Sequence, residues 1–179
     1  MIEKAFSIDI DAPVAKVWDE ITKTNGLHRA MFDTRLEVEM RPGGKMRYKT
    51  ANGKATPVWG EVIEVRKPNR FVHTFAFGGV DDAPTTVTWD LAETPTGCRV
   101  TVTHSGFPSE TKTLKSVSSV WPAILGRYKS IMEKGTIPLG TRMQYALMGA
   151  MSFMMPKAMR TENVEKFIAE RGWEKPAKP

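Results

Sequence analysis

Two histidines on predicted strands are the side chains best suited to chemistry in this sequence. Residues 71–77 and 100–104 alternate so that His73 and His104 fall on the same faces as Phe and Val side chains. An imidazole on an apolar surface costs free energy unless it is hydrogen-bonded. Each histidine is therefore either a structural residue bonded to a backbone carbonyl, to Tyr48 or to water, or a group that orients the polar end of a ligand.

A catalytic role is the alternative for these histidines. Either could act as a general base on a carbonyl compound, together with Tyr48 or Tyr128. The sequence contains no nucleophile elbow, phosphate-binding loop or dinucleotide fingerprint that would support an enzyme. Its 3 histidines, at positions 28, 73 and 104, lack the short spacing of metal ligands. We therefore expect no metal, no cofactor and binding without turnover.

Further apolar and aromatic residues are expected to share the interior face with the histidines. Taken singly, such aromatic residues belong to a core more often than to a binding surface, so their assignment depends on the fold. Methionines among them would give a lining of adaptable shape. The predicted ligand-binding set is Met31, Phe32, Met46, Tyr48, Trp59, His73, Phe75, Trp89, Val102, His104, Trp121, Leu125 and Tyr128.

Strands and two kinds of helix would position these residues. Residues 4–10 alternate as a strand, and residues 14–21 carry apolar side chains at the spacing of a short one-sided helix. Between 36 and 104 the period is two and turns recur about every ten residues, which predicts six antiparallel strands. A wide apolar stripe from about residue 110 predicts a long core helix that ends at Gly135. The predicted fold class is α+β, with a curved antiparallel sheet of about seven strands around the long helix and a cavity between them.

Four segments carry a family resemblance: IDAPVAKVWDEIT, RPGGKMRY, GEVIEVRKPNRFVHTF and TVTWDLAETPTGCRVTVTHSGF, followed by Trp121 in the long helix. Together they resemble the SRPBCC or START-like helix-grip superfamily, in particular the branch related to the activator of heat-shock-protein-90 ATPase, over about residues 3–135. The chain carries Met31-Phe32 where that branch commonly has a tryptophan, beside the expected cavity mouth. The resemblance implies a helix-grip fold with an internal pocket.

Members of this superfamily differ widely in function, so the resemblance implies three candidates. The leading one is non-catalytic binding or transfer of an apolar small molecule, either a lipid or an aromatic, polyketide-like compound. A cyclase-type enzyme acting on a bound polyketide-like substrate is the second. A protein-interaction module related to chaperones is the third.

Charge and cysteine content bear on partners and compartment. Lys and Arg outnumber Asp and Glu by 26 to 20, which gives a net charge of +6. No run of basic residues is longer than two, so the basic stripe of a nucleic-acid-binding protein is missing. The lone Cys98 fits a reducing compartment, and the N-terminal segment lacks the apolar stretch of a signal peptide. We expect a cytoplasmic protein without a nucleic-acid partner.

A C-terminal extension follows the predicted domain of residues 1–135. Within residues 136–179, a Met-rich helix over 139–155 is too short for the roughly 20 residues of a membrane span, and Thr161 can begin a further helix. The Met-rich helix could pack on the domain as a lid, join a second copy, or make a weak contact with an anionic membrane surface. We expect intramolecular packing, in a monomer or a homodimer.

Overall fold

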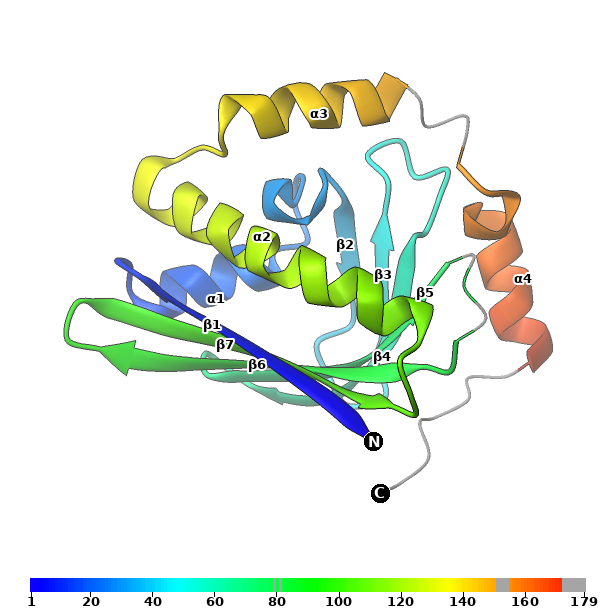
Figure 1. The fold of residues 1–179 in the computed structure, drawn as a ribbon, viewed down its shortest axis with the longest axis horizontal. Coiled ribbons are helices and arrows are strands. Elements are labelled where there is room, and N and C mark those ends of the chain that lie inside the picture. The colour runs from blue at the N-terminus through cyan, green and yellow to red at the C-terminus, as the bar shows by residue number, and fades with distance from the viewer. Residues whose placement is uncertain (79, 81, 151–154, 172–179) are drawn as a thin grey trace.

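The computed structural model describes residues 1–78, 80, 82–150 and 155–171. All strands of the described chain lie before residue 108, together with α1 and η1, and the remaining helices follow from residue 112 (Figure 1). The elements in chain order are β1 (Ile2–Ile10), α1 (Val14–Thr22), η1 (Arg29–Met31), β2 (Arg35–Val38), β3 (Lys45–Lys49), β4 (Val58–Arg66), β5 (Arg70–Phe77), β6 (Thr85–Thr94), β7 (Gly97–Phe107), α2 (Lys112–Lys134), α3 (Leu139–Ala150), η3 (Lys157–Met159) and α4 (Thr161–Arg171).

Seven strands form one antiparallel sheet in the order β1-β7-β6-β5-β4-β3-β2. Its interior face carries the alternate residues of the long strands, such as Val87, Trp89 and Leu91 on β6, all of which are buried. Helix α2 crosses this face diagonally, and α1 lies beside it (Figure 1). The predicted α+β helix-grip fold is therefore confirmed.

Helix α2 has well-formed ends. Thr111 is the N-cap, and its hydroxyl accepts a hydrogen bond from the Leu114 amide at 3.1 Å. The Asp82 carboxylate accepts another from the Thr113 amide at 2.8 Å, where a negative charge also favours the helix dipole. At the other end Gly135 takes a left-handed conformation with φ of 71° and donates to Ile131, as a C-terminal cap requires.

Strands β4 and β5 leave no room for a side chain at Gly60. A Cβ on this residue would lie 2.0 Å from the backbone oxygen of Thr74, a separation that no side chain tolerates. The next amide, that of Glu61, donates to the Thr74 hydroxyl at 2.8 Å, and the register shifts between Val62 and Glu64. The absence of a Cβ at Gly60 therefore lets the two strands keep this contact where β4 becomes irregular.

The C-terminal helix α4 covers the other face of the sheet over β4 and β5. Val164 is buried there in a small cluster with Trp59 and Ala76. The connection to it is held by backbone hydrogen bonds, including Thr56 N to Met159 O at 2.8 Å. Strand β5 is therefore buried on both faces, which explains its almost unbroken burial.

Helix α3 is attached more loosely. Its inward side chain is Tyr145, which is buried against Phe32, whereas most of its other apolar side chains face solvent. Residues 139–150 of the Met-rich segment are helical as predicted, and residues 151–154 lie outside the described part of the chain. Within the described residues, no helix is long and apolar enough to cross a bilayer.

Candidate functional site

His104 is the centre of a chain of hydrogen bonds through the core. The Trp121 indole, which can only donate, reaches His104 Nδ1 at 3.1 Å, so the imidazole proton is on Nε2. His104 Nε2 donates to the Thr85 hydroxyl at 2.7 Å, and Thr85 donates to the Phe75 carbonyl at 3.2 Å. These bonds join α2 to three neighbouring strands. They also occupy both nitrogens of the ring.

Burial keeps this imidazole neutral. His104 is fully enclosed, and its ring centroid is 4.9 Å from that of Phe75 and 4.7 Å from that of Phe107. Desolvation, and then the nearby His73, lower the pKa of His104 to about 3. With Nδ1 accepting and Nε2 donating, His104 has the full set of partners expected of a structural histidine.

His73 lies on β5 near the same ring system. Its Nδ1 is 2.8 Å from the Thr74 carbonyl, so Nδ1 carries the proton in the neutral ring. Its ring centroid is 5.0 Å from that of Phe71. Desolvation lowers the pKa of His73 to about 4, although the bond to Thr74 acts in the opposite direction. His73 is therefore uncharged at neutral pH.

A second polar group lies between η1, β3 and α2. His28, buried and bonded through Nε2 to the Lys23 carbonyl at 2.6 Å, has its Nδ1 3.5 Å from the Tyr128 hydroxyl. The Tyr48 ring meets the His28 ring edge-on at 5.9 Å. Burial raises the pKa of both tyrosines, so their hydroxyls stay protonated and donate rather than act as bases. The ligand-binding set predicted from the sequence does not include His28.

Trp89 sits between these two groups. Its ring packs edge-on against Trp121 at 5.3 Å and against Tyr128 at 5.9 Å, both on α2. Its indole nitrogen Nε1 is buried and has no hydrogen-bond partner among the described residues. A buried N–H without a partner costs about 1–3 kcal/mol, so it marks either a strained core or a place where another molecule accepts the bond.

The structure brings most of the predicted ligand-binding residues together, in one core between α2 and the sheet. His73 and His104 lie against the aromatic part of this core, and Phe32 is half-buried at its edge. Trp59 is different because it lies on the opposite face, under α4. The core cluster contains Met31, Met46, Tyr48, Phe75, Trp89, Val102, Trp121, Leu125 and Tyr128.

The backbone is unusual at the edge of this core, where η1 ends. Phe32 and Asp33 both have positive φ, of 59° and 53°, a backbone conformation that residues other than Gly rarely adopt. The Arg127 guanidinium from α2 lies 4.9 Å from the Phe32 ring centroid and 5.5 Å from that of Tyr145 on α3. The core, α2 and the extension therefore meet at Phe32. No pattern in the sequence indicates this strained turn.

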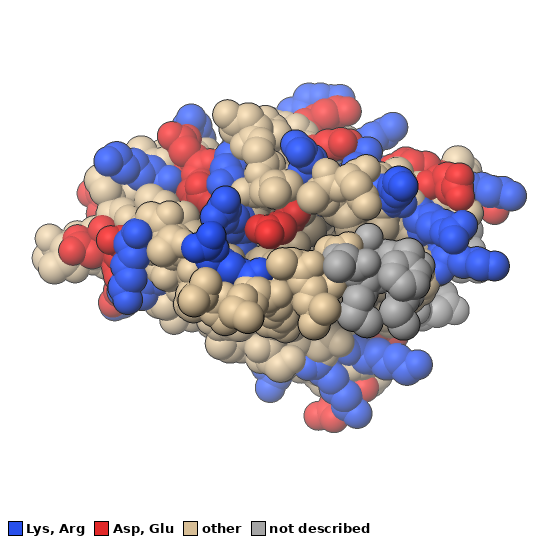
Figure 2. Space-filling view, turned by 90° about the horizontal axis from the view of Figure 1, so that it is seen from above, with Lys and Arg blue, Asp and Glu red and all other residues tan. Residues whose placement is uncertain are grey.

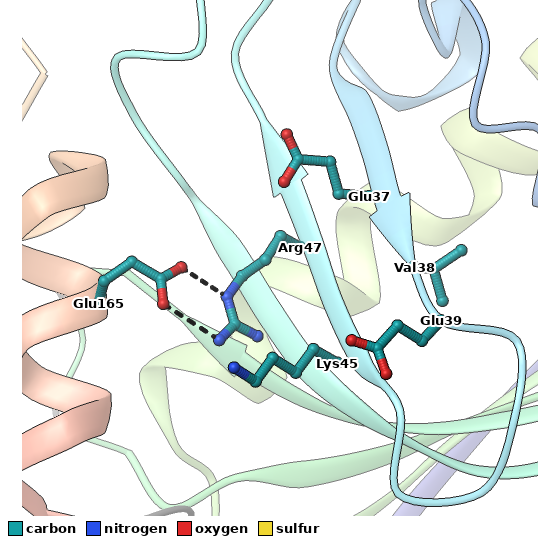
Figure 3. Close-up of a pocket in the computed structure, with 6 residues that line it drawn as sticks. All are labelled: Glu37, Val38, Glu39, Lys45, Arg47 and Glu165. Atoms are coloured by element: carbon teal, nitrogen blue, oxygen red, sulfur yellow. Dashed lines mark hydrogen bonds and ion pairs between the residues drawn. The ribbon is translucent and has the colours of Figure 1, made fainter.

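A separate, polar pocket of about 340 Å³ lies between β2, β3 and α4 (Figure 3). The Arg47 side chain, only 7% exposed, points across it to Glu165, with Nε 2.9 Å from Oε1. Arg47 also donates to the Met46 carbonyl at 3.0 Å. The charge of Arg47 is thus paired and its donors are used. We therefore interpret this pocket as part of the contact that holds α4 on the sheet.

Removing Glu165 should loosen α4. Glu165→Ala leaves the buried Arg47 without its ionic partner, and an unpaired buried charge is strongly unfavourable. Because Glu165 itself is 46% exposed, we expect a discounted cost of about 1–2 kcal/mol, or about tenfold faster amide hydrogen exchange in α4. Glu170→Ala breaks only an exposed pair with Lys166 on the same helix and should leave exchange nearly unchanged. Equal exchange in both variants would contradict this role.

The family comparison agrees with this architecture. The sequence profile described as "Activator of Hsp90 ATPase homolog 1-like protein" matches residues 11–133, more than half of the chain. The chain belongs to this family. The matched range runs from the end of β1 to the end of α2, so the resemblance noted in the sequence is confirmed for the Hsp90 activator homolog 1-like domain. A comparison with curated proteins finds no significant match.

Several solved structures share the fold of this Hsp90 activator homolog 1-like chain. MLL2253 from Mesorhizobium loti is 19% identical with a TM-score of 0.64, over 74% of this chain and 98% of that one. DynU16, from the dynemicin biosynthetic locus, is 23% identical with a TM-score of 0.63, over 75% of this chain but 48% of its own. The Aha1 dimer from Colwellia psychrerythraea is 18% identical with a TM-score of 0.61, over 75% of this chain and 98% of that one. At these identities the likeness extends to the fold alone.

Proposed function

We propose that this protein binds an apolar small molecule between α2 and the sheet and does not change it chemically. The unpartnered indole N–H of Trp89 carries this proposal. Around it the core offers apolar rings and few polar atoms, as ligand sites do. A ligand with one acceptor oxygen, such as a carbonyl or ether, would complete the hydrogen bonding of Trp89 while its apolar body lay among the surrounding rings.

The hydrogen bonds of the two histidines favour binding over catalysis. His104 would have to give up its bond from Trp121 before Nδ1 could accept a proton from a substrate. The low pKa of both rings makes them weak bases at neutral pH. The chaperone-related alternative has support only from the family to which the chain belongs, because no contact surface for a chaperone follows from the fold.

Native mass spectrometry tests the proposal directly. Protein purified from the organism that makes it should carry an added mass, which is released on denaturation and identifies the ligand. The purified protein should also bind the aromatic probe 1-anilinonaphthalene-8-sulfonate without losing its near-ultraviolet circular dichroism, which separates binding from unfolding. An unaltered mass together with no binding of the probe to the folded protein would reject the proposal.

Two matched tryptophan variants test the polar end of the site. Trp89→Phe removes an N–H that has no partner among the described residues, whereas Trp121→Phe removes one that donates to His104. Both lose the same atoms, so the cost of the void largely cancels between them. We expect Trp121→Phe to be less stable than Trp89→Phe by about 2 kcal/mol in urea unfolding of ligand-free protein.

The amount of bound ligand should follow the opposite order, so that the more stable of the two variants carries less of it. Trp89→Phe should lose most of the added mass, since its indole would be the donor to the ligand, while the folded fraction of Trp121→Phe should keep it. Equal stabilities with unchanged ligand content would mean that the Trp89 nitrogen has no role in binding.

A further inference from the structure

Helix α3 carries an apolar stripe that is exposed among the described residues. Leu139, Met143 and Leu147 follow one another at a spacing of four and are 67%, 67% and 62% exposed. Met148, which lies between this stripe and Tyr145 round the helix, is 48% exposed. Tyr145, about 200° round the helix from Met143, is buried on the domain and fixes the stripe on the outer side. The orientation of the stripe is thus set by the fold.

The charge of this part of the chain has one sign. Between Glu133 and Glu162 there is no acidic residue, whereas Lys134, Arg142 and Lys157 are basic, as is Arg160. Figure 2, seen from the side of α3, shows an uncharged band across this face, with Lys and Arg side chains and an acidic side chain beside it. An isolated amphipathic helix needs its own charged side, but here the domain lies against the inner side of α3, at Tyr145, and takes the place of that side.

We propose that α3 docks the protein on an anionic lipid surface, with its stripe in the headgroup and acyl boundary. Interfacial helices combine exposed Leu and Met side chains with surrounding cations, and the net charge of +6 adds long-range attraction. Helix α3 has 12 residues and no means of spanning the bilayer, so the contact is peripheral. The proposal does not depend on the ligand proposed for the core.

A second copy of the chain fits the stripe less well. In a two-fold contact each α3 faces its own equivalent, so Arg142 and its basic neighbours would meet the same charges without an acidic residue from that segment. A single helix face of about 18 Å also offers less than the roughly 800 Å² per partner of a standard interface. An anionic membrane complements both features, because the acyl boundary accepts the apolar stripe and the headgroups attract the surrounding basic residues.

Vesicle co-sedimentation of the full chain tests the proposal. Wild type should partition onto vesicles of phosphatidylcholine and phosphatidylserine in equal parts, and only weakly onto phosphatidylcholine alone. Leu139→Ser, Met143→Ser and Leu147→Ser combined should lower the partition coefficient by at least about tenfold, because the apolar contact is lost. Ile63→Ser, which removes an exposed side chain on β4, is the matched control and should leave partitioning unchanged.

Charge-reversal variants measure the electrostatic contribution to vesicle binding. Arg142→Glu should weaken binding about fivefold or more, and Lys16→Glu on α1, the same change of net charge elsewhere, should have a smaller effect. Circular dichroism establishes that each variant is folded. Equal partitioning of wild type and the triple variant overturns the proposal. So does a triple variant that changes only the oligomeric state in analytical ultracentrifugation, which would assign the stripe to a dimer.

Discussion

Between pH 7 and pH 4.5 the free energy of unfolding should fall by about 5 kcal/mol, because two buried histidines stay neutral in the folded protein. Both have an ordinary pKa of 6.5, which folding lowers to about 4 for His73 and about 3 for His104. In this pH range both imidazoles take up protons in the unfolded chain, whereas they stay largely neutral in the folded protein. The contribution of the two histidines to the free energy of unfolding is complete above their ordinary pKa of 6.5 and is lost as the pH falls toward their pKa values in the folded protein. The pKa of His28 is also lowered by burial and acts in the same direction.

Urea unfolding at a series of pH values measures this effect. Each unmatched proton contributes a slope of about 1.4 kcal/mol per pH unit. His73→Phe keeps a ring of similar size against Phe71 and cannot titrate, so it should remove about half of the pH dependence attributed to the two rings. Carboxylates with lowered pKa, such as Glu165, act mainly below this window. A slope that is the same in wild type and variant would show that His73 titrates normally in the folded state.

Gly60→Ala should destabilise the fold by about 3 kcal/mol or more, since its Cβ would meet the backbone oxygen of Thr74 on the next strand. A flexible side chain such as Met46 could move aside, but the Thr74 carbonyl is held in the middle of the sheet. Relief therefore requires β4 and β5 to separate. That movement would also break the bond from Glu61 to the Thr74 hydroxyl.

The same substitution on α2 is the control. Gly126 is exposed in the helix and has no atom within 4 Å of its Cβ position, so Gly126→Ala should raise stability by about 0.5–1 kcal/mol. Thermal or urea unfolding compares the two variants directly. Similar values for both would mean that the sheet accommodates a side chain at Gly60.

Period and turn spacing were enough to predict the sheet and α2. The alternation that places His104 beside Val100 and Val102 correctly predicted an interior histidine. Its partners could not be predicted, because Thr85 and Trp121 reach it only through strand register and the tilt of α2, which no local pattern encodes.

Trp59 and α3 show what sequence patterns leave undetermined. The sequence predicts Trp59 on the interior face with the other aromatic residues, but Val58 and Val62 take that face and Trp59 points the other way. The helix that buries it begins about a hundred residues later, beyond the reach of a periodicity argument. For α3 the sequence predicted the helix itself, whereas its position on the domain depends on the Tyr145 contact with Phe32.

The place of β1 in the sheet governs how this chain can fold as it is synthesised. β1 is the first strand to be made and is an edge strand whose one partner in the sheet is β7, with Ile2 facing Phe107. The hairpins from β2 to β7 form between neighbours in sequence, but β1 has no edge to join until about a hundred further residues have left the ribosome. Because such distant pairings carry a large loop-closure entropy, closure of β1 on β7 is expected to come late and to limit the folding rate.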